Sequence, residues 1–348
     1  MQIIQLITLT NDLNSGIITS IEPATLSLTS VRMRNPAGLF YNRGLTMYQY
    51  PKPFLSVSQL IEKLTTLGME IPYYDEAEEA FTTIGYYRLR GYFYHQFDQA
   101  NNRYKEGTNL NAVLNLYRFD TEMAHLIFEY LSQIEVALRV RFVNAFQPMQ
   151  DSLILSDPSA FKNKKNYWNN QGAIAHEITR SNDVFIAHNF DNHDGAIPLW
   201  ASVEIMSFGT LSKLIKNLQT GQRSAFSCIA QNYQYKNASG NLVTPSQDML
   251  TSWIQAVSAM RNICAHNSRI YNRAINTIPK LISSDIITPQ PRYNGLYQML
   301  LAMKYLRPTD QHWIEFVNEF KELLNTYNGV YEMNRMNFPA DWETHFQV

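Results

Sequence analysis

Residues 244–280, TPSQDMLTSWIQAVSAMRNICAHNSRIYNRAINTIPK, form the stretch around which the chain is organised. The stretch begins as a helix does, with Thr244 as N-cap, Pro245 at the first helical position and Gln247 three residues after the cap. At about 100° per residue, five apolar side chains fall within about 60° of one another. They are Trp253, Val257, Met260, Cys264 and Tyr271. This pattern predicts a helix that is buried along one face.

The opposite side of the same helix carries a polar stripe. Its members are Asn262, His266, Arg269 and Arg273. Arg261 lies between the two stripes, and its side chain is long enough to reach the polar one. No Asp or Glu occurs from residue 249 to 284, so nothing within the segment neutralises these cations. An anionic group, most simply a phosphate, is the ligand that such an edge favours.

The same stripe also has a simpler interpretation, because any surface helix shows polar residues opposite apolar ones. A periodic run of more than about 25 residues also indicates a break, which we expect at Asn267-Ser268. A break there would move Arg269 and Arg273 off the stripe. It would leave Arg261, Asn262 and His266 in register.

Composition limits the class of protein. The chain has 348 residues and a formal net charge of −1, which excludes a globally basic nucleic-acid binder but not a local basic cleft. The two cysteines form no CxxC, so a disulfide scaffold and a cysteine-based zinc site are not predicted. No apolar run reaches the length of a membrane span and no signal peptide is recognisable, so we expect a cytoplasmic protein without a membrane partner.

Along the chain, the pattern predicts a mainly α fold in three parts. They are an irregular extension over 1–46, a small helical region over 47–107 and a larger helical domain over 108–348. Met47 opens the more regular part and is a candidate translation start beside Met1. Residues 150–197 are polar, and we expect long loops there. A first helix is predicted to start at Ser56 or Ser58 and to end at Gly68. Further helices are predicted at 75–84, 109–147, 295–306 and 310–327, with two short helices in 197–221 separated by Gly209.

Two further stretches carry candidate functional residues. Residues 84–97, IGYYRLRGYFYHQF, interleave basic residues with tyrosines, which suits either RNA contact or an aromatic core element with exposed arginines. In the predicted helix 109–147, Glu135 lies at the margin of the apolar face, and Arg139 is its i,i+4 partner. A carboxylate at such a margin often pairs with a cation from a neighbouring helix, and we expect Arg261 to be that cation.

Other chemistries find no support in the motifs. His188, Asp191, His193 and Asp194 are close in sequence, but their spacing matches no ligand pattern. His176-Glu177 is not HExxH, because Arg180 stands where the second His would be needed. The chain has no Walker loop, no GxGxxG and no GxSxG. We therefore predict neither a metal nor a cofactor.

RNICAHN followed by SRIYNR resembles the Arg-x4–6-His signature of the HEPN superfamily. Five other stretches resemble the Abi-like branch, the bacterial abortive-infection proteins, and extend the resemblance over about residues 51–342. They are KPFLSVSQLIEKL, IGYYRLRGYF, FDTEM…IEVALR, PLWASVEIMSFGTLSKL and FPADW.

The resemblance implies a HEPN-type helical bundle that forms a homodimer and brings two Arg/His motifs to one cleft. It implies a metal-independent endoribonuclease for phage defence, with RNA as partner. His266 would be the general acid/base, Arg261 the phosphate-holding cation and Asn262 the residue that orients the His or the phosphate. The residues expected to support RNA binding are Asn267, Arg269, Arg273, Glu135 and Arg139.

Two other functions remain open at this point. The same cations could hold a structured small RNA without cutting it, or the polar stripe could be a solvated face of a purely structural dimer. The sequence leaves open the RNA target, the activating signal and an antitoxin partner.

Overall fold

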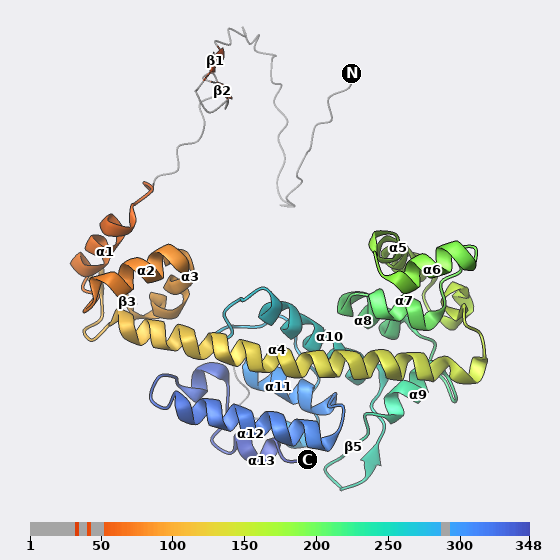
Figure 1. Cartoon of the computed structure of the whole chain (residues 1–348). Helices are drawn as coiled ribbons and strands as arrows, with labels where there is room; N and C mark the ends of the chain where they lie inside the picture. Colours follow the sequence, from red (N-terminus) through yellow and green to blue (C-terminus); the bar gives the residue numbers. More distant parts are fainter. Residues whose placement is uncertain (1–31, 35–39, 43–51, 287–292) are drawn as a thin grey trace, which may run out of the picture. The chain divides into compact units, whose positions relative to one another are not determined.

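The computed structural model describes residues 32–34, 40–42, 52–286 and 293–348 (Figure 1). The chain divides into two units, Met1–Phe54 and Leu55–Val348. In the first, β1 (Arg32–Arg34) and β2 (Phe40–Asn42) pair antiparallel with Met33 opposite Tyr41. Most of the predicted irregular extension over 1–46, and Met47 with it, lies outside the described residues. The second unit is mainly helical, as predicted.

Three short helices open the second unit. Ser56 and Gln59 form a reciprocal capping box, so α1 starts where the sequence predicts it, and Gly68 follows it at φ +92°. A short antiparallel hairpin follows α3. The bounds are α1 (Val57–Thr66), α2 (Tyr74–Thr83), α3 (Tyr86–Phe93), β3 (Phe97–Asp98) and β4 (Arg103–Tyr104).

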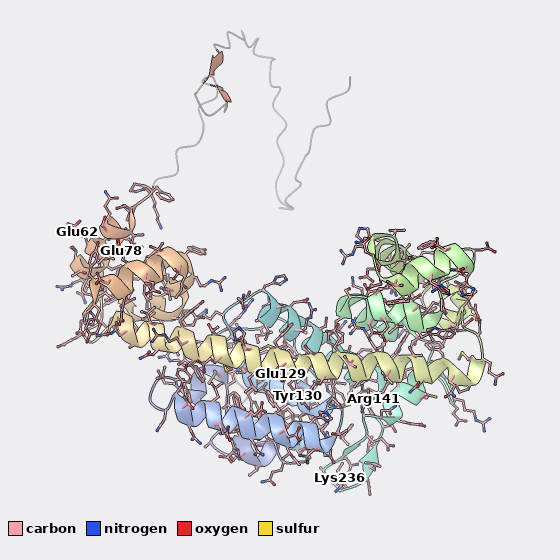
Figure 2. All side chains as sticks on the ribbon, in the orientation of Figure 1. Glu62, Glu78, Glu129, Tyr130, Arg141 and Lys236 are labelled. Atoms are coloured by element: carbon pink, nitrogen blue, oxygen red, sulfur yellow. The ribbon has the colours of Figure 1, made fainter. Side chains whose placement is uncertain are left out.

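The longest helix is α4 (Leu110–Phe146), to which much of the unit is attached (Figure 1). Neither Gly nor Pro interrupts its 37 residues, and Asn109 caps it by accepting from the amide of Asn111. It packs against α3, α7, α8, α9, α10 and α12. Two of its side chains, labelled in Figure 2, show how: Tyr130 stacks on Phe316 of α12 with ring centroids 4.7 Å apart, and Arg141 donates to the Pro308 carbonyl at 2.6 Å.

The prediction of long loops over residues 150–197 is wrong. The segment contains α5 (Lys164–Arg180) and α6 (Val184–Asn192). The buried face of α5 carries Asn170 and Glu177 beside Tyr167 and Ile174, so half of its buried side chains are polar. Hydrophobic periodicity cannot reveal a helix whose inward face is polar. Glu177 is held there because it accepts from the Thr210 hydroxyl at 3.0 Å.

The next segment forms two short helices as predicted, but with a different boundary. They are α7 (Leu199–Ile205) and α8 (Phe208–Asn217), and the break lies at Met206-Ser207. Ser207 caps α8 by accepting from the amide of Thr210, so Gly209 lies inside the helix. A further short helix, α9 (Ala225–Gln231), and a hairpin of β5 (Tyr235–Lys236) and β6 (Leu242–Val243) precede the central stretch.

The central helix α10 (Gln247–Ala265) is capped by Ser246, not by Thr244. The Ser246 hydroxyl accepts from the amide of Met249, whereas the hydroxyl of Thr244 accepts from the Gln234 side chain at 3.0 Å. The predicted apolar stripe is confirmed for the four members that lie in the helix, all of which are buried; Tyr271 is also buried but lies beyond the helix end at Ala265. The helix packs between α4, α8 and α11.

Helices α11 (Leu296–Tyr305) and α12 (Asp310–Thr326) lie close to their predicted positions, and α13 (Trp342–His345) ends the chain. Aromatic side chains make many of the contacts here. The indole N–H of Trp313 donates to the Phe346 carbonyl at 2.7 Å, and the rings of Phe320 and Phe338 stack with their centroids 5.8 Å apart. Within the described ranges, no helix combines the length and the apolar character needed to cross a membrane.

Candidate functional site

The predicted helix break is confirmed at the end of α10. Asn267 adopts the left-handed conformation at φ +47°, and two backbone hydrogen bonds close the helix: Ser268 N–H to the Ile263 carbonyl and Asn267 N–H to the Cys264 carbonyl, both 2.9 Å. This is the Schellman arrangement, in which Asn is the usual substitute for Gly. The Arg88 guanidinium of α3 donates to the Asn267 carbonyl and fixes the turn from outside.

The break leaves Asn262 and His266 together on one exposed edge. His266 is the C-cap, and its amide still donates to the Asn262 carbonyl at 3.1 Å, so the two side chains keep the i,i+4 relation of a helix. Neither side chain has a hydrogen bond to another residue in the described parts of the chain. Both are exposed and free to meet a ligand.

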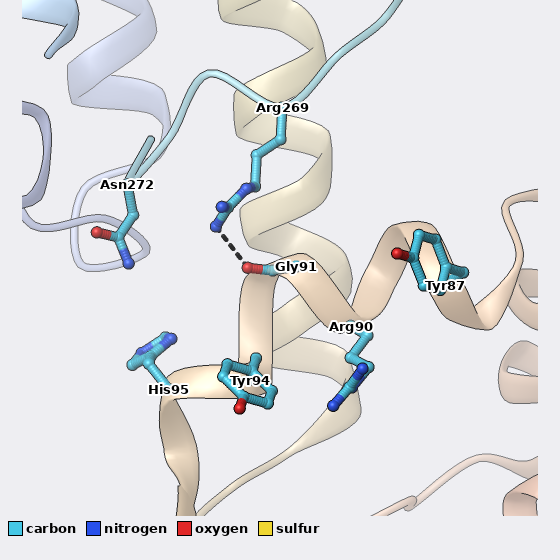
Figure 3. Close-up of a pocket in the computed structure, with 7 residues that line it drawn as sticks. All are labelled: Tyr87, Arg90, Gly91, Tyr94, His95, Arg269 and Asn272. Atoms are coloured by element: carbon cyan, nitrogen blue, oxygen red, sulfur yellow. Dashed lines mark hydrogen bonds between the residues drawn. The ribbon is translucent and has the colours of Figure 1, made fainter. Parts of the chain in front are cut away.

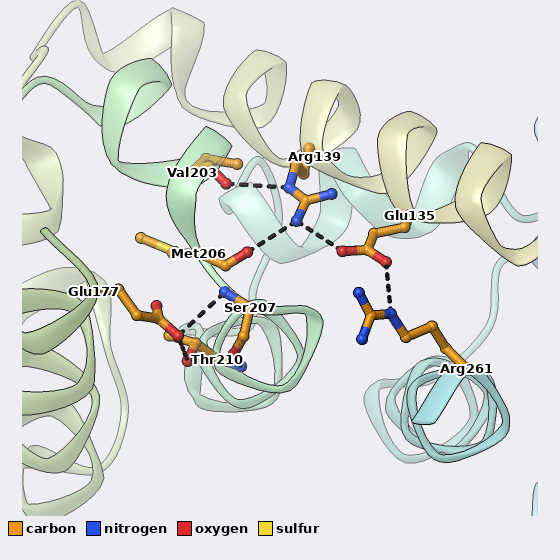
Figure 4. A network of polar contacts seen from close by, with 8 residues as sticks. All are labelled: Glu135, Arg139, Glu177, Val203, Met206, Ser207, Thr210 and Arg261. Atoms are coloured by element: carbon orange, nitrogen blue, oxygen red, sulfur yellow. Dashed lines mark hydrogen bonds and ion pairs between the residues drawn. The ribbon is translucent and has the colours of Figure 1, made fainter. Parts of the chain in front are cut away.

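Arg261 points to α4, where the predicted pair with Glu135 is found (Figure 4). Its Nε lies 3.5 Å from Glu135 Oε2, which is an ion-pair distance, but the geometry is too poor for a hydrogen bond. The guanidinium also lies 5.8 Å from the ring centroid of Phe128. The Arg261 side chain remains 37% exposed. Its stem is therefore fixed while its terminal nitrogens remain available to solvent or a ligand.

Arg139 in turn fixes Glu135 (Figure 4). Its Nη2 donates to Glu135 Oε1 at 2.7 Å and to the Met206 carbonyl at 2.8 Å, and its Nε donates to the Val203 carbonyl at 3.1 Å. These carbonyls belong to the C-terminal end of α7, where a cation complements the helix dipole. The contacts Arg139–Glu135–Arg261 thus connect three helices, and Arg139 and Glu135 are largely shielded from water.

The other two arginines of the predicted stripe leave it after the break. Arg269 turns to α3 and donates to the Gly91 carbonyl at 2.5 Å. Its guanidinium lies 5.9 Å from the ring centroid of Tyr92. Arg273 donates to the Arg269 carbonyl at 3.0 Å. The site therefore contains Arg261, Asn262 and His266, supported by Glu135 and Arg139, while Arg269 and Arg273 lie on a different surface.

Sequence reasoning missed one residue that positions the motif. Asp120 of α4 is buried and accepts from the amides of Ile270 at 3.0 Å and Tyr271 at 2.7 Å, and from the Tyr92 hydroxyl at 2.6 Å. Burial raises the pKa of the Asp120 carboxyl, and the three donors oppose that rise. The sequence signal that could have identified it is an Asp within the apolar face of a long helix. An Asp is rarely buried without hydrogen-bond partners, so such a position indicates a structural contact.

Metal ligation finds no geometric basis in the described segments, where no three His, Cys, Asp or Glu side chains gather. Glu177 Oε1 accepts from the Ser207 amide and the Thr210 hydroxyl at the start of α8. Cys264, the cysteine within the motif, is a poor nucleophile and a poor metal ligand, because burial raises the pKa of its thiol to about 12.

The comparisons with known proteins agree with the sequence resemblance at the level of the family. The sequence model of the family described as "Abi-like protein" matches residues 79–272, more than half of the chain. This segment reaches from α2 to the loop after α10 and includes every residue of the site. No curated protein and no solved structure matches the chain. The chain belongs to the Abi-like protein family, which suggests a role in abortive infection.

Proposed function

We propose that this protein is a HEPN-type endoribonuclease that acts in abortive infection and cleaves RNA without a metal. The observation that carries the proposal is the position of Arg261. Its permanently charged guanidinium lies against Glu135, which Arg139 holds in turn, and Arg261 directly precedes the exposed Asn262 and lies five residues before the exposed His266. A guanidinium held beside an unpaired imidazole is the arrangement expected at a phosphodiester-binding site, whereas an arginine on a solvated surface needs no such support.

The chemistry follows from these groups. His266 takes the proton of a ribose 2′-OH, the 2′-oxygen attacks the adjacent phosphorus, and the bond to the 5′-oxygen of the next nucleotide breaks. The products are a 2′,3′-cyclic phosphate and a 5′-hydroxyl. An imidazole titrates near neutral pH and so can act as base or acid. Arg261 balances the negative charge that grows on the phosphoryl oxygens, and Asn262 orients the phosphate or the imidazole.

The reaction also supports a homodimer. The departing 5′-oxygen needs a proton, and residues 247–273, which hold α10 and the start of the loop after it, contain one histidine, His266. A second copy of the chain would supply a second His266 as the acid. Val136 and Val140 of α4 are 59% and 51% exposed, and they follow Glu135 and Arg139 directly in sequence, so an apolar surface suited to a second copy adjoins the site.

The test compares wild type with His266→Ala on single-stranded RNA in the presence of a chelator. His176→Ala is the matched control, because His176 is also exposed and lies on a different helix, α5. We expect His266→Ala to lose about 10²–10⁴-fold in rate and the control to cleave as wild type does. Products should resist 3′-end labelling until the cyclic phosphate is opened and the resulting monophosphate is removed. Equal cleavage by wild type and His266→Ala would remove His266 from the mechanism.

One observation favours a second candidate function, a non-catalytic RNA-binding protein. Within the described residues, no side chain orients the His266 ring, whereas catalytic histidines usually have an orienting partner. In this alternative, a discrete small RNA copurifies, remains intact on long incubation and binds His266→Ala as tightly as wild type. Loss of RNA integrity in the wild type alone would decide against it.

A further inference from the structure

A polar pocket lies between α3 and the loop that follows α10 (Figure 3). Its volume is about 460 Å³, within the range of ligand pockets of about 300–1,000 Å³. Figure 3 shows Arg269 reaching from the loop to the Gly91 carbonyl of α3. The lining residues are Tyr87, Arg90, Gly91, Tyr94, His95, Arg269 and Asn272.

The lining of this pocket is cationic and aromatic. Arg90 and Arg269 supply the positive charge, and no carboxylate lines the pocket. Among the described residues, Arg90 forms no ion pair with a carboxylate. Its guanidinium instead lies 4.8 Å from the ring centroid of Tyr94. An unpaired arginine at the wall of a polar pocket is suited to a phosphate, which it can bind with two parallel hydrogen bonds.

The tyrosines supply the other half of the chemistry. Tyr87 is 87% exposed and Tyr94 is 50% exposed, so neither ring is used by the core. Aromatic faces beside arginines are the common means by which proteins bind unpaired nucleotides, since a base stacks on the ring while the cation holds its phosphate.

The pocket is built on the same segment as the motif. Arg269 follows His266 by three residues, so their Cα atoms are at most about 11 Å apart. Arg88 of α3 holds the Asn267 carbonyl between them. Asp120 fixes the amides of the two residues after Arg269. One RNA strand that meets His266 would therefore reach this pocket within a few nucleotides.

We propose that this pocket binds one unpaired nucleotide of the RNA that His266 cleaves, with the base stacked on Tyr94 and the phosphate held by Arg90 and Arg269. The inference rests on the proposed function and extends it, because it gives the enzyme a preference for single-stranded RNA. Tyr94, Arg90 and Arg269 are positioning residues that place the strand and take no part in proton transfer.

The experiment measures binding of a fluorescent single-stranded RNA to the full chain carrying His266→Ala, so that the RNA stays intact. We expect Tyr94→Ala to weaken binding about tenfold by loss of base stacking. Tyr94→Phe, which keeps the ring, should bind as the parent does. Tyr74→Ala is the matched control, because Tyr74 is 49% exposed and lies outside the pocket on α2. Arg90→Ala should reduce the magnitude of the negative slope of log affinity against log salt concentration by about 0.7, because one phosphate contact is lost.

The same variants, made in the chain that retains His266, distinguish the pocket proposal from the proposed nuclease function. We expect Tyr94→Ala to raise KM for single-stranded RNA with little change in kcat, and duplex RNA to bind more weakly than single strands. If wild type binds and cuts RNA while Tyr94→Ala and Arg90→Ala match the Tyr74→Ala control, the pocket inference is overturned and the proposed function stands. If wild type neither binds nor cuts RNA, both are overturned.

Discussion

Glu135→Gln is expected to impair cleavage more than it impairs the fold. The Glu135 carboxylate is nearly buried and receives the Arg139 guanidinium at 2.7 Å. Loss of its charge weakens a charge-assisted hydrogen bond worth roughly 1.5–3 kcal/mol, but the amide oxygen of Gln remains as an acceptor, so we expect a loss of about 1–2 kcal/mol in unfolding free energy. The contact with Arg261 adds little to stability, because that side chain is 37% exposed and lies 3.5 Å away.

The larger effect falls on the position of Arg261. Without a negative charge behind it, the guanidinium can leave the place where a phosphate would meet it. A displacement of about 1 Å can cost about 10²-fold in rate, so we expect kcat/KM for RNA to fall 10- to 100-fold. Glu129→Gln is the control, because Glu129 is an exposed glutamate of the same helix (Figure 2).

The assay combines thermal unfolding with single-turnover cleavage for Glu135→Gln, Arg261→Ala and the double variant. If Glu135 acts through Arg261, the double variant cleaves no more slowly than Arg261→Ala alone. Cleavage by Glu135→Gln at the wild-type rate, or full additivity of the two single effects, would refute this reasoning.

Three further predictions concern other residues. Asn267→Ala should lower the unfolding free energy by about 1 kcal/mol, while Asn267→Gly should not, because the residue sits at φ +47°; chemical denaturation of both variants checks this, and equal losses would contradict it. Burial, and then the charge of Arg335, lowers the pKa of His95 in the folded protein. As the pH falls, His95 is therefore protonated in the unfolded chain before it is protonated in the folded one. Stability should therefore decline as the pH falls below about 6.5, and less so in His95→Gln; identical pH profiles would count against it. In the native protein, iodoacetamide should modify the half-buried Cys228 before Cys264, because burial raises the pKa of the Cys264 thiol to about 12. Mass spectrometry gives the order of modification, and the reverse order would contradict this prediction.

The sequence was sufficient where local rules decide the structure. The apolar stripe of α10 and its end near Asn267 follow from helical periodicity and from the tolerance of Asn for positive φ. The sequence left Ser56 and Ser58 as candidate caps of α1, and the structure shows Ser56 in a capping box with Gln59. The Glu135–Arg261 pair was also predictable, because a carboxylate at the margin of a buried face needs a cation, and the segment around Arg261 is rich in cations and has no acid.

The sequence was insufficient where distant parts of the chain meet. Asp120 and Tyr271 are 151 residues apart, and only the packing of α4 against α10 shows that one holds the backbone of the other. The turn of Arg269 to the Gly91 carbonyl depends on α3 in the same way. Helix α5 was missed for a different reason, since Asn170 and Glu177 occupy positions where the periodicity rule expects apolar side chains.

The central claim is that a ribose 2′-hydroxyl attacks its own phosphodiester at the Arg261–His266 edge. The measurement that tests it most directly is cleavage of an RNA in which the 2′-hydroxyl at the mapped cleavage position is replaced by hydrogen, with chelator present. The account predicts that this linkage remains intact while the unmodified RNA is cut to a 2′,3′-cyclic phosphate. Cleavage of the modified linkage at the rate of the unmodified one would contradict it.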